Sequence, residues 1–133
     1  MKARPVVLSL LIAGLMTVGT VASRNQIGYA RTAAIVNFVD PVLVTDRVVM
    51  GPVLIVHDDE KMALGEACTT FYRFDPARGP QEEILSFHCT PVQRSVAEKT
   101  RLTLSERSDP GCKRLLEYQV AGESEAHAIP LTR

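Results

Sequence analysis

From residue 31 onward, the chain is a series of short apolar runs that turn-forming residues separate. The runs are rich in Val, Ile, Leu, Phe and Thr, and breakers such as Asp40-Pro41, Gly51-Pro52 and Asp109-Pro110-Gly111 stand between them. The runs cover residues 33–39, 42–44, 47–50, 53–57, 68–75, 83–90, 100–105 and 115–120. The sequence therefore predicts an all-β fold, a small antiparallel sandwich or open barrel of about seven strands.

One segment has the spacing of a helix instead. Acidic residues crowd the start of residues 58–64, where the helix dipole favours negative charge. Gly65 follows at the position where a C-terminal cap belongs. We therefore expect a single short helix over residues 58–64, which interrupts an otherwise strand-forming chain.

The N-terminus has the layout of a secretory signal. Lys2 and Arg4 form a positively charged start, and residues 6–16 are an uncharged apolar run. Thr20-Val21-Ala22 then supplies small residues at the two positions that a signal cleavage site requires. The sequence thus predicts a signal peptide over residues 1–22.

A second cleavage site is present after Ala30, and the two sites leave the domain boundary open by a few residues. In either case residues 31–133 are expected to form a single β domain that is secreted or periplasmic. The alternative is an uncleaved anchor, because the uncharged stretch 5–23 has about the length needed to span a bilayer.

The charge balance excludes some classes of partner. The whole chain has 15 basic and 15 acidic residues. Lys2 and Arg4 are the only charged residues of the predicted signal, so cleavage leaves a slightly acidic domain. Such a domain has no electrostatic reason to bind nucleic acid or, after cleavage, an anionic membrane.

A hairpin can be predicted across residues 68–89. If residues 76–81 form its loop, antiparallel pairing places Cys68 opposite Cys89. Alternation then gathers one apolar face, made of Cys68, Thr70, Tyr72, Phe74, Glu83, Leu85, Phe87 and Cys89. Phe71 falls on the other, more polar face. A slip of one residue would turn the side chains of one strand to the wrong side.

The opposed cysteines predict a Cys68–Cys89 disulfide, since opposed Cα atoms about 4.5–5.5 Å apart suit such a bond and export supplies oxidising conditions. The alternative is two reduced core cysteines. Cys112 is then left outside the bridge, where Lys113 and Arg114 would increase its reactivity or where it would pair with another chain. Because Cys112 could replace either partner, the connectivity stays open.

Several side chains are soft or borderline metal ligands. Besides the cysteines, the candidates are His57, Met62, His88 and His127. Imidazole together with thiolate or thioether suits copper or zinc. The ligand types resemble those of cupredoxins, but the spacing differs, because His88 precedes Cys89 and no methionine follows. A disulfide would remove both thiolates, so copper or zinc is the alternative to an expectation of no cofactor.

Enzyme signatures are missing from the sequence. It contains no G-x-S-x-G, no H-E-x-x-H, no C-x-x-C and no phosphate-binding glycine loop. Ser124, Glu125 and His127 are close in sequence, but the members of a catalytic triad come together through the fold rather than through adjacency. The sequence therefore predicts no catalytic residues and favours a protein that is not an enzyme.

Four short sequence segments between residues 36 and 119 resemble segments of other proteins. They are Val36-Asn37-Phe38, Val53-Leu54-Ile55-Val56-His57-Asp58-Asp59, Ser86-Phe87-His88-Cys89 and Leu116-Glu117-Tyr118-Gln119. In these strings the chain resembles small exported β-domain proteins of soil bacteria that have no assigned function. The resemblance implies a free-standing exported β domain and implies no activity or ligand.

Together these observations predict a non-enzymatic binding or structural module of the bacterial cell envelope. Its partner would be an unknown protein or small molecule. The alternative is a small periplasmic or secreted protein that binds copper or zinc through His and Cys or Met ligands.

Overall fold

A computed structural model describes residues 31–107 and 111–132 of the chain. The predicted signal peptide, residues 1–22 with its alternative end at residue 30, lies outside the described residues. In the described part of the chain, no helix has both the length and the apolar character to cross a membrane.

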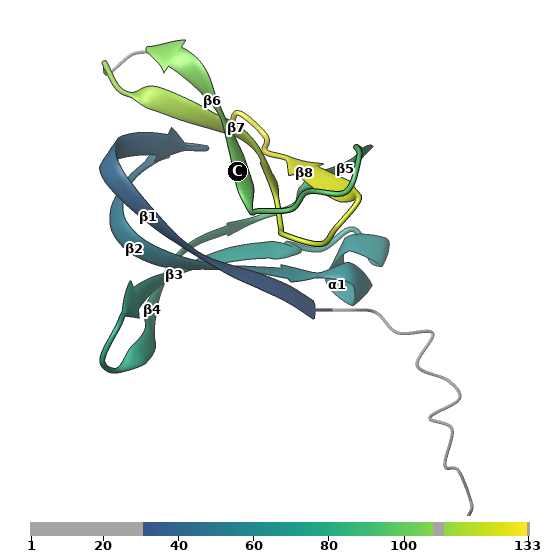
Figure 1. The fold of residues 1–133 in the computed structure, drawn as a ribbon, viewed down its shortest axis with the longest axis horizontal. Helices are drawn as coiled ribbons and strands as arrows, with labels where there is room; N and C mark the ends of the chain where they lie inside the picture. The colour runs from purple at the N-terminus through teal and green to yellow at the C-terminus, as the bar shows by residue number, and fades with distance from the viewer. Residues whose placement is uncertain (1–30, 108–110, 133) are drawn as a thin grey trace, which may run out of the picture.

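The described residues form eight strands and one short helix (Figure 1). The strands are β1 (Arg31–Val44), β2 (Arg47–Asp58), β3 (Thr69–Asp75), β4 (Gly79–Phe87), β5 (Thr90–Gln93), β6 (Arg101–Arg107), β7 (Lys113–Gln119) and β8 (Glu125–Ala128). They form one sheet in the order β4-β3-β2-β1-β7-β8-β5, and β6 pairs with β7. The predicted all-β class is confirmed.

The sheet is mixed rather than purely antiparallel. β1 and β7 run parallel, while the other strand pairs are antiparallel. The parallel contact joins an N-terminal half, β1–β4 with α1 (Asp59–Ala63), to a C-terminal half, β5–β8. It comprises only the pairs Val42–Lys113 and Leu43–Arg114. Local sequence patterns carry no signal for such a long-range pairing.

β1 and β2 are longer than the sequence predicted, because two expected breakers lie inside them. Asp40-Pro41 falls within β1, where the register shifts between Phe38 and Val42. A proline is tolerated at such a bulge because its missing N–H has no partner to lose. Gly51 lies opposite Phe38 with φ of 84°, which bends β2 without ending it.

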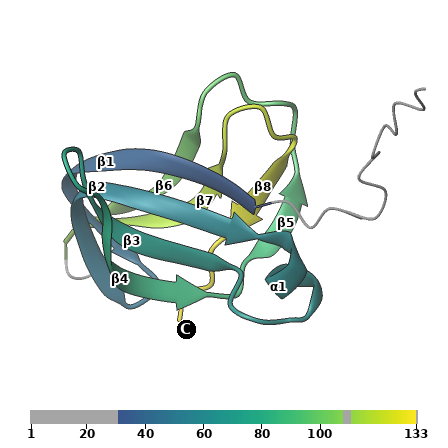
Figure 2. The ribbon, with the colours of Figure 1, turned by 90° about the horizontal axis from the view of Figure 1, so that it is seen from below.

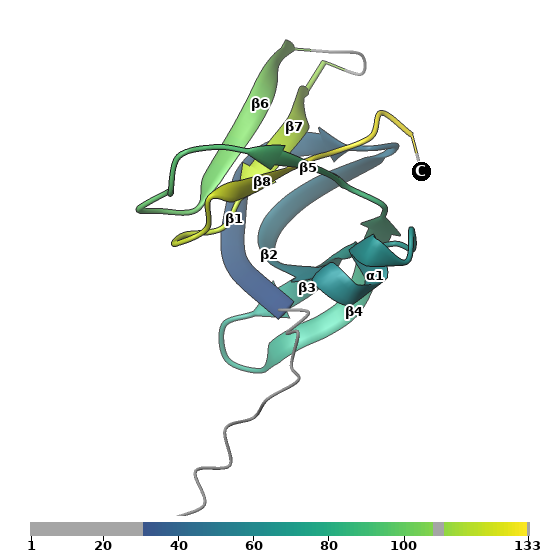
Figure 3. The same cartoon turned by 90° about the vertical axis from the view of Figure 1, so that its right-hand side faces the viewer.

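The two halves face each other across one core. Figure 2 shows β1–β4 side by side with α1 beyond the end of β2, and Figure 3 shows the C-terminal half on the other side of the interior. The most deeply buried large side chains come from both halves and include Ile55, Phe71, Leu85, Leu115 and Tyr118. The core therefore holds the halves together where the strand pairing between them is short.

The predicted register of the β3–β4 hairpin is wrong. Phe71 pairs with Leu85 and is fully buried, so β3 turns Thr69 and Phe71 inward rather than Thr70 and Tyr72. The loop is also shorter than expected, because Asp75 pairs with Gly79 instead of Glu82. Asp75 Oδ1 accepts hydrogen bonds from the backbone N–H groups of residues 77 and 78, at 2.8 and 3.2 Å, and this turn closes the hairpin early.

The predicted helix is confirmed as α1. Asp58 caps it, with Oδ1 accepting from the N–H groups of Glu60 and Lys61 at 3.0 and 3.2 Å. Gly65 has φ of 72° and follows the C-cap residue Leu64. Capping by the Asp58 side chain thus starts α1 directly at the end of β2, and the link after α1 leads to Cys68 and β3.

Candidate metal and thiol site

The chemistry-bearing residues gather where β2, β3, β4 and β8 approach one another. His57 is the penultimate residue of β2, and its register partner Thr69 opens β3 directly after Cys68. The Asp58 N–H donates to the Cys68 carbonyl at 2.8 Å, which holds Cys68 beside the end of β2. Cys89 lies in the short link between β4 and β5, so the site draws on the ends of several strands.

Cys68 and Cys89 lie side by side in the core. Their Sγ atoms are 2.8 Å apart, and the Cys89 N–H donates to Cys68 Sγ at 3.1 Å. The side chains are 2% and 0% exposed. Both are free thiols in this structure, since a disulfide bond requires about 2.05 Å. The predicted disulfide stays a prediction.

The cysteines meet even though the hairpin register was wrong. By the observed register, Thr69 pairs with Phe87, so the paired ladder ends one residue from Cys68 and two residues from Cys89. Beyond the ladder, alternation no longer dictates where a side chain points. His88 faces outward and Cys89 turns inward onto Cys68.

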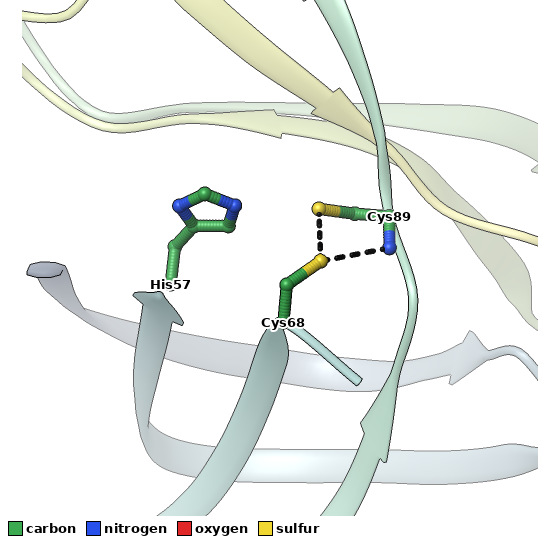
Figure 4. A group of neighbouring side chains, drawn as sticks. All are labelled: His57, Cys68 and Cys89. Atoms are coloured by element: carbon green, nitrogen blue, oxygen red, sulfur yellow. Dashed lines mark hydrogen bonds between the residues drawn. The ribbon is translucent and has the colours of Figure 1, made fainter. Parts of the chain in front are cut away.

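His57 and the two cysteines form a triad of side chains that could hold a metal ion (Figure 4). A ring nitrogen of His57 and the two sulfur atoms all lie within 4.8 Å of one another. The imidazole is 1% exposed, and its Nδ1 lies 3.2 Å from Asp59 Oδ1. Its Nε2 is the one buried side-chain nitrogen or oxygen without a hydrogen-bond partner in the described parts of the chain.

His127 covers the triad from β8. Its ring stacks on His57 with centroids 3.9 Å apart, and its Nδ1 lies 3.6 Å from Cys89 Sγ. Tyr118, whose hydroxyl shares a hydrogen bond with Thr69 Oγ1, packs against the other side of His127 at 5.0 Å between centroids. His127 is therefore in contact with the site, in an orientation set by stacking.

The other two predicted ligands occupy more peripheral positions. His88 is exposed, and its Nδ1 lies 2.9 Å from the Glu66 carbonyl and 3.8 Å from Cys68 Sγ. Met62, on α1, is partly buried and packs against the hydrophobic core. The structure thus brings His57 and His127 to the cysteines, places His88 at the surface beside Cys68, and uses Met62 in packing.

Burial shifts the pKa values of three groups of the site in the direction that favours their neutral forms. Desolvation raises the pKa of the Cys89 thiol, and it lowers the pKa of His57 although Asp59 opposes this shift. Desolvation and the neighbouring His57 together lower the pKa of His127 to about 4. At neutral pH both imidazoles are in the unprotonated form that binds metals. The thiols must lose their protons when a metal binds.

Cys112 lies elsewhere in the fold. It is partly buried beside Lys113 and lines a cavity of about 800 Å³ whose wall also includes Phe38, Val42 and Leu104. The histidines do not line this cavity. The predictions that Cys112 is a thiol outside the bridge, or a link to another chain, stay predictions.

Sequence reasoning missed two features of the site. The partner of His57 is Asp59, two residues along the chain, which was interpreted only as part of a helix start. The stacking of His127 on His57 joins residues that are 70 positions apart, and no local pattern signals it. Alternation in Glu125-Ala126-His127-Ala128 would instead group His127 with Glu125, away from the two alanines, so it gives no signal that His127 is buried.

The chain matches no protein-family model, and neither the curated proteins nor the solved structures contain a match to it. The resemblance to exported proteins of soil bacteria therefore remains an expectation. Function has to be inferred from the side chains of this chain.

Proposed function

We propose that this protein is an exported, non-enzymatic module that binds one copper or zinc ion through His57, Cys68 and Cys89. Export is supported by the charge and hydropathy pattern of residues 1–22. Metal binding is supported by the convergence of one imidazole and two thiols in the core. Nitrogen and sulfur ligands of this kind suit zinc and Cu(I).

The observation that carries the proposal is the unpartnered Nε2 of His57. A buried polar atom without a hydrogen bond costs about 1–3 kcal/mol, so such atoms call for an explanation. When Nδ1–H donates to Asp59, the lone pair is on Nε2 and is available to a metal. A carboxylate behind a ligating histidine is the usual arrangement in metal sites.

Charge and burial also agree with a bound cation. Two thiolates would carry two negative charges into a site where both cysteines are almost fully buried. A divalent ion would neutralise them, whereas burying the thiolates alone would be very unfavourable. The His127 ring, which stacks on His57 and packs against Tyr118, would help to exclude water from the site.

The test is metal binding by the full chain, produced with its own N-terminus, purified without a histidine tag and kept reduced. Metal analysis and competition with chelators of known affinity should give one zinc or one Cu(I) per chain. Cobalt substitution should produce sulfur-to-cobalt charge-transfer absorption, which reports thiolate ligation. The N-terminal residue of the purified protein checks cleavage after residue 22 or residue 30.

Matched variants separate the site from incidental binding. Cys89→Ser should abolish the cobalt charge-transfer signal from that thiolate and weaken zinc binding, while Cys112→Ser should leave both unchanged. Binding of less than one ion per chain by the reduced protein, or equal losses in the two variants, would overturn the proposal.

A second function, binding of a small apolar molecule, is favoured by the cavity of about 800 Å³. Its size is that of a ligand pocket, and its wall is mainly apolar. A hydrophobic fluorescent probe should bind in this cavity of the wild-type protein, and it should bind more weakly to the Leu104→Asp variant. Equal probe binding by the variant would remove this candidate.

A further inference from the structure

We infer that Cys68 and Cys89 also form a reversible disulfide, and that this bond and the bound metal exclude each other, so that oxidation releases the ion. The inference rests on the proposed metal site. It adds that the site has two chemical states, one that holds metal and one that does not.

The sulfur atoms lie between the distances that the two states require. They are 2.8 Å apart. A disulfide needs them about 0.8 Å closer. With metal–sulfur bonds of about 2.3 Å and tetrahedral angles, two ligating sulfurs are about 3.8 Å apart, so metal binding needs them about 1.0 Å further apart. Movements of similar size in opposite directions lead to the two states.

Such movements do not disturb the strand ladders. The last paired residues before the cysteines are Thr69 and Phe87, so each sulfur lies just outside the hydrogen-bonded ladder of the β3–β4 hairpin. The backbone of Cys68 is held by its hydrogen bond from Asp58. The Cys89 link is short and makes its N–H contact to Cys68 Sγ rather than to a strand. Side-chain rotation at both cysteines therefore suffices.

An exposed residue, His88, lies beside the pair. Its Nδ1 lies 3.8 Å from Cys68 Sγ, whereas Cys89 is covered by His127. Cys68 is itself only 2% exposed, so an external disulfide reaches it, ahead of Cys89, once His88 moves aside. Cys89 lies within reach to complete the exchange from inside.

The chemistry balances with a small-molecule or protein disulfide as the oxidant. The Cys68 thiolate attacks one sulfur of this oxidant, which forms a mixed disulfide and expels the first thiolate. The Cys89 thiolate then attacks Cys68 Sγ, which forms the internal disulfide and expels the second thiolate. The two cysteines lose two electrons, the oxidant gains them and takes up two protons from solvent, and the metal leaves with its oxidation state unchanged, as Zn²⁺ or Cu(I).

The experiment uses the full chain with Cys112→Ser, so that the only remaining cysteines are the pair. The protein is equilibrated in buffers with graded ratios of reduced to oxidised glutathione, and alkylated thiols and bound zinc are counted in the same samples. Both thiols should disappear together, and zinc should be lost at the same midpoint. Once the free zinc concentration exceeds the dissociation constant of the site, a tenfold increase in zinc should stabilise the reduced protein. The value of [GSH]²/[GSSG] at the midpoint of oxidation should then fall about tenfold.

The two proposals fail in different ways. Zinc that stays bound to protein without free thiols would overturn the exclusion, and thiols that persist in fully oxidised buffer would overturn the disulfide. A reduced protein that binds no zinc would instead overturn the proposed function. His57→Ala separates the two roles further, because it should lose zinc and still form the disulfide. Loss of disulfide formation in that variant would contradict the inference.

Discussion

The two ends of β1 border very different environments. At the Arg31 end, β1 pairs with Asp58 beside the thiol site, where His57 and His127 are 1% and 3% exposed. At the Val42 end, β1 lines the cavity, and Val39 and Val48 are 74% and 53% exposed. The titratable groups near the Arg31 end are buried, whereas the other end combines exposed valines with buried cavity-lining residues such as Phe38 and Val42, each 4% exposed. Buried polar groups and clustered exposed apolar groups are the two departures from the usual distribution of residues, and each end of β1 has one of them.

The difference also concerns how each end is closed. β2, β3, β4 and β8 converge around the thiol site, where His127 stacks on His57 and packs against Tyr118. Near the cavity, β1 bulges between Phe38 and Val42 and pairs with β7 over two residues. A closed, polar site favours an ion, whereas an open, apolar one favours a larger molecule.

The largest expected effect is on the free energy of unfolding, and it compares the packing at the two ends of β1. Phe87→Ala removes a 3% exposed ring that packs against Phe71 next to the thiol site, and it should reduce the free energy of unfolding by about 3–5 kcal/mol. Val48→Ala, at the cavity, should change it by less than about 0.5 kcal/mol. Urea unfolding of the reduced, chelator-treated protein measures both. Similar losses in the two variants would show that the ends are equally well packed.

Acid should destabilise the metal-free, reduced protein through His127. The pKa of His127 is about 4 in the folded chain against 6.5 in the unfolded chain, so between these pH values only the unfolded chain binds the proton. Stability should fall as the pH decreases from about 6.5 to 4, by an amount on the order of 3 kcal/mol. His57 adds a loss of the same sign.

Acidic side chains also contribute to acid unfolding, so the measurement is a difference. Urea unfolding of the wild-type protein and of His127→Gln, each from pH 7 to pH 4, isolates the contribution of His127. The variant should have the shallower dependence of stability on pH. Parallel curves would mean that His127 is not buried in its neutral form.

A smaller effect is expected from Asp59, the residue that contacts the Nδ1 atom of the proposed ligand His57. Asp59→Asn removes the carboxylate that orients His57, and it should weaken zinc binding by about 10–100-fold. Glu60→Gln changes the next residue of α1, which is exposed, and serves as the matched control. Chelator competition on both variants measures the effect. Unchanged affinity in Asp59→Asn would indicate that His57 does not bind the ion through Nε2.

The smallest expected effect is that of a substitution in the cavity on zinc binding at the thiol site. Leu104→Asp alters the cavity wall and should leave zinc affinity within about twofold of the wild type, since distant sites are usually independent. The same titrations measure it. A larger change would show that the two ends are energetically coupled.

The fold class could be predicted because its signals are local. β-branched runs, turn residues and the pair Asp58 and Gly65 each specify the structure of a few neighbouring residues, and the strands and α1 follow from them. β5 and β8 were missed because Thr90–Gln93 and Glu125–Ala128 contain few strand-forming residues and are held mainly by pairing with each other.

The candidate site could be predicted only in part. The proximity of Cys68 and Cys89 follows from any hairpin centred near residue 78. The hairpin register did not follow, because both faces of β3 carry aromatic residues and the Asp75 turn decides between them. The placement of His127 depends on pairing between β7 and β8, which no short segment of the sequence specifies.

The narrow β1–β7 contact has a consequence for the lifetime of a bound ion. His57, Cys68 and Cys89 belong to the first 89 residues of the chain, but the ring that covers them comes from β8. An ion could enter while the C-terminal strands are still undocked and would then be enclosed when they close. While the cysteines stay reduced, its escape would wait for those strands to lift away, so the residence time of the ion would depend on the opening rate of the protein as well as on the strength of the metal–sulfur bonds.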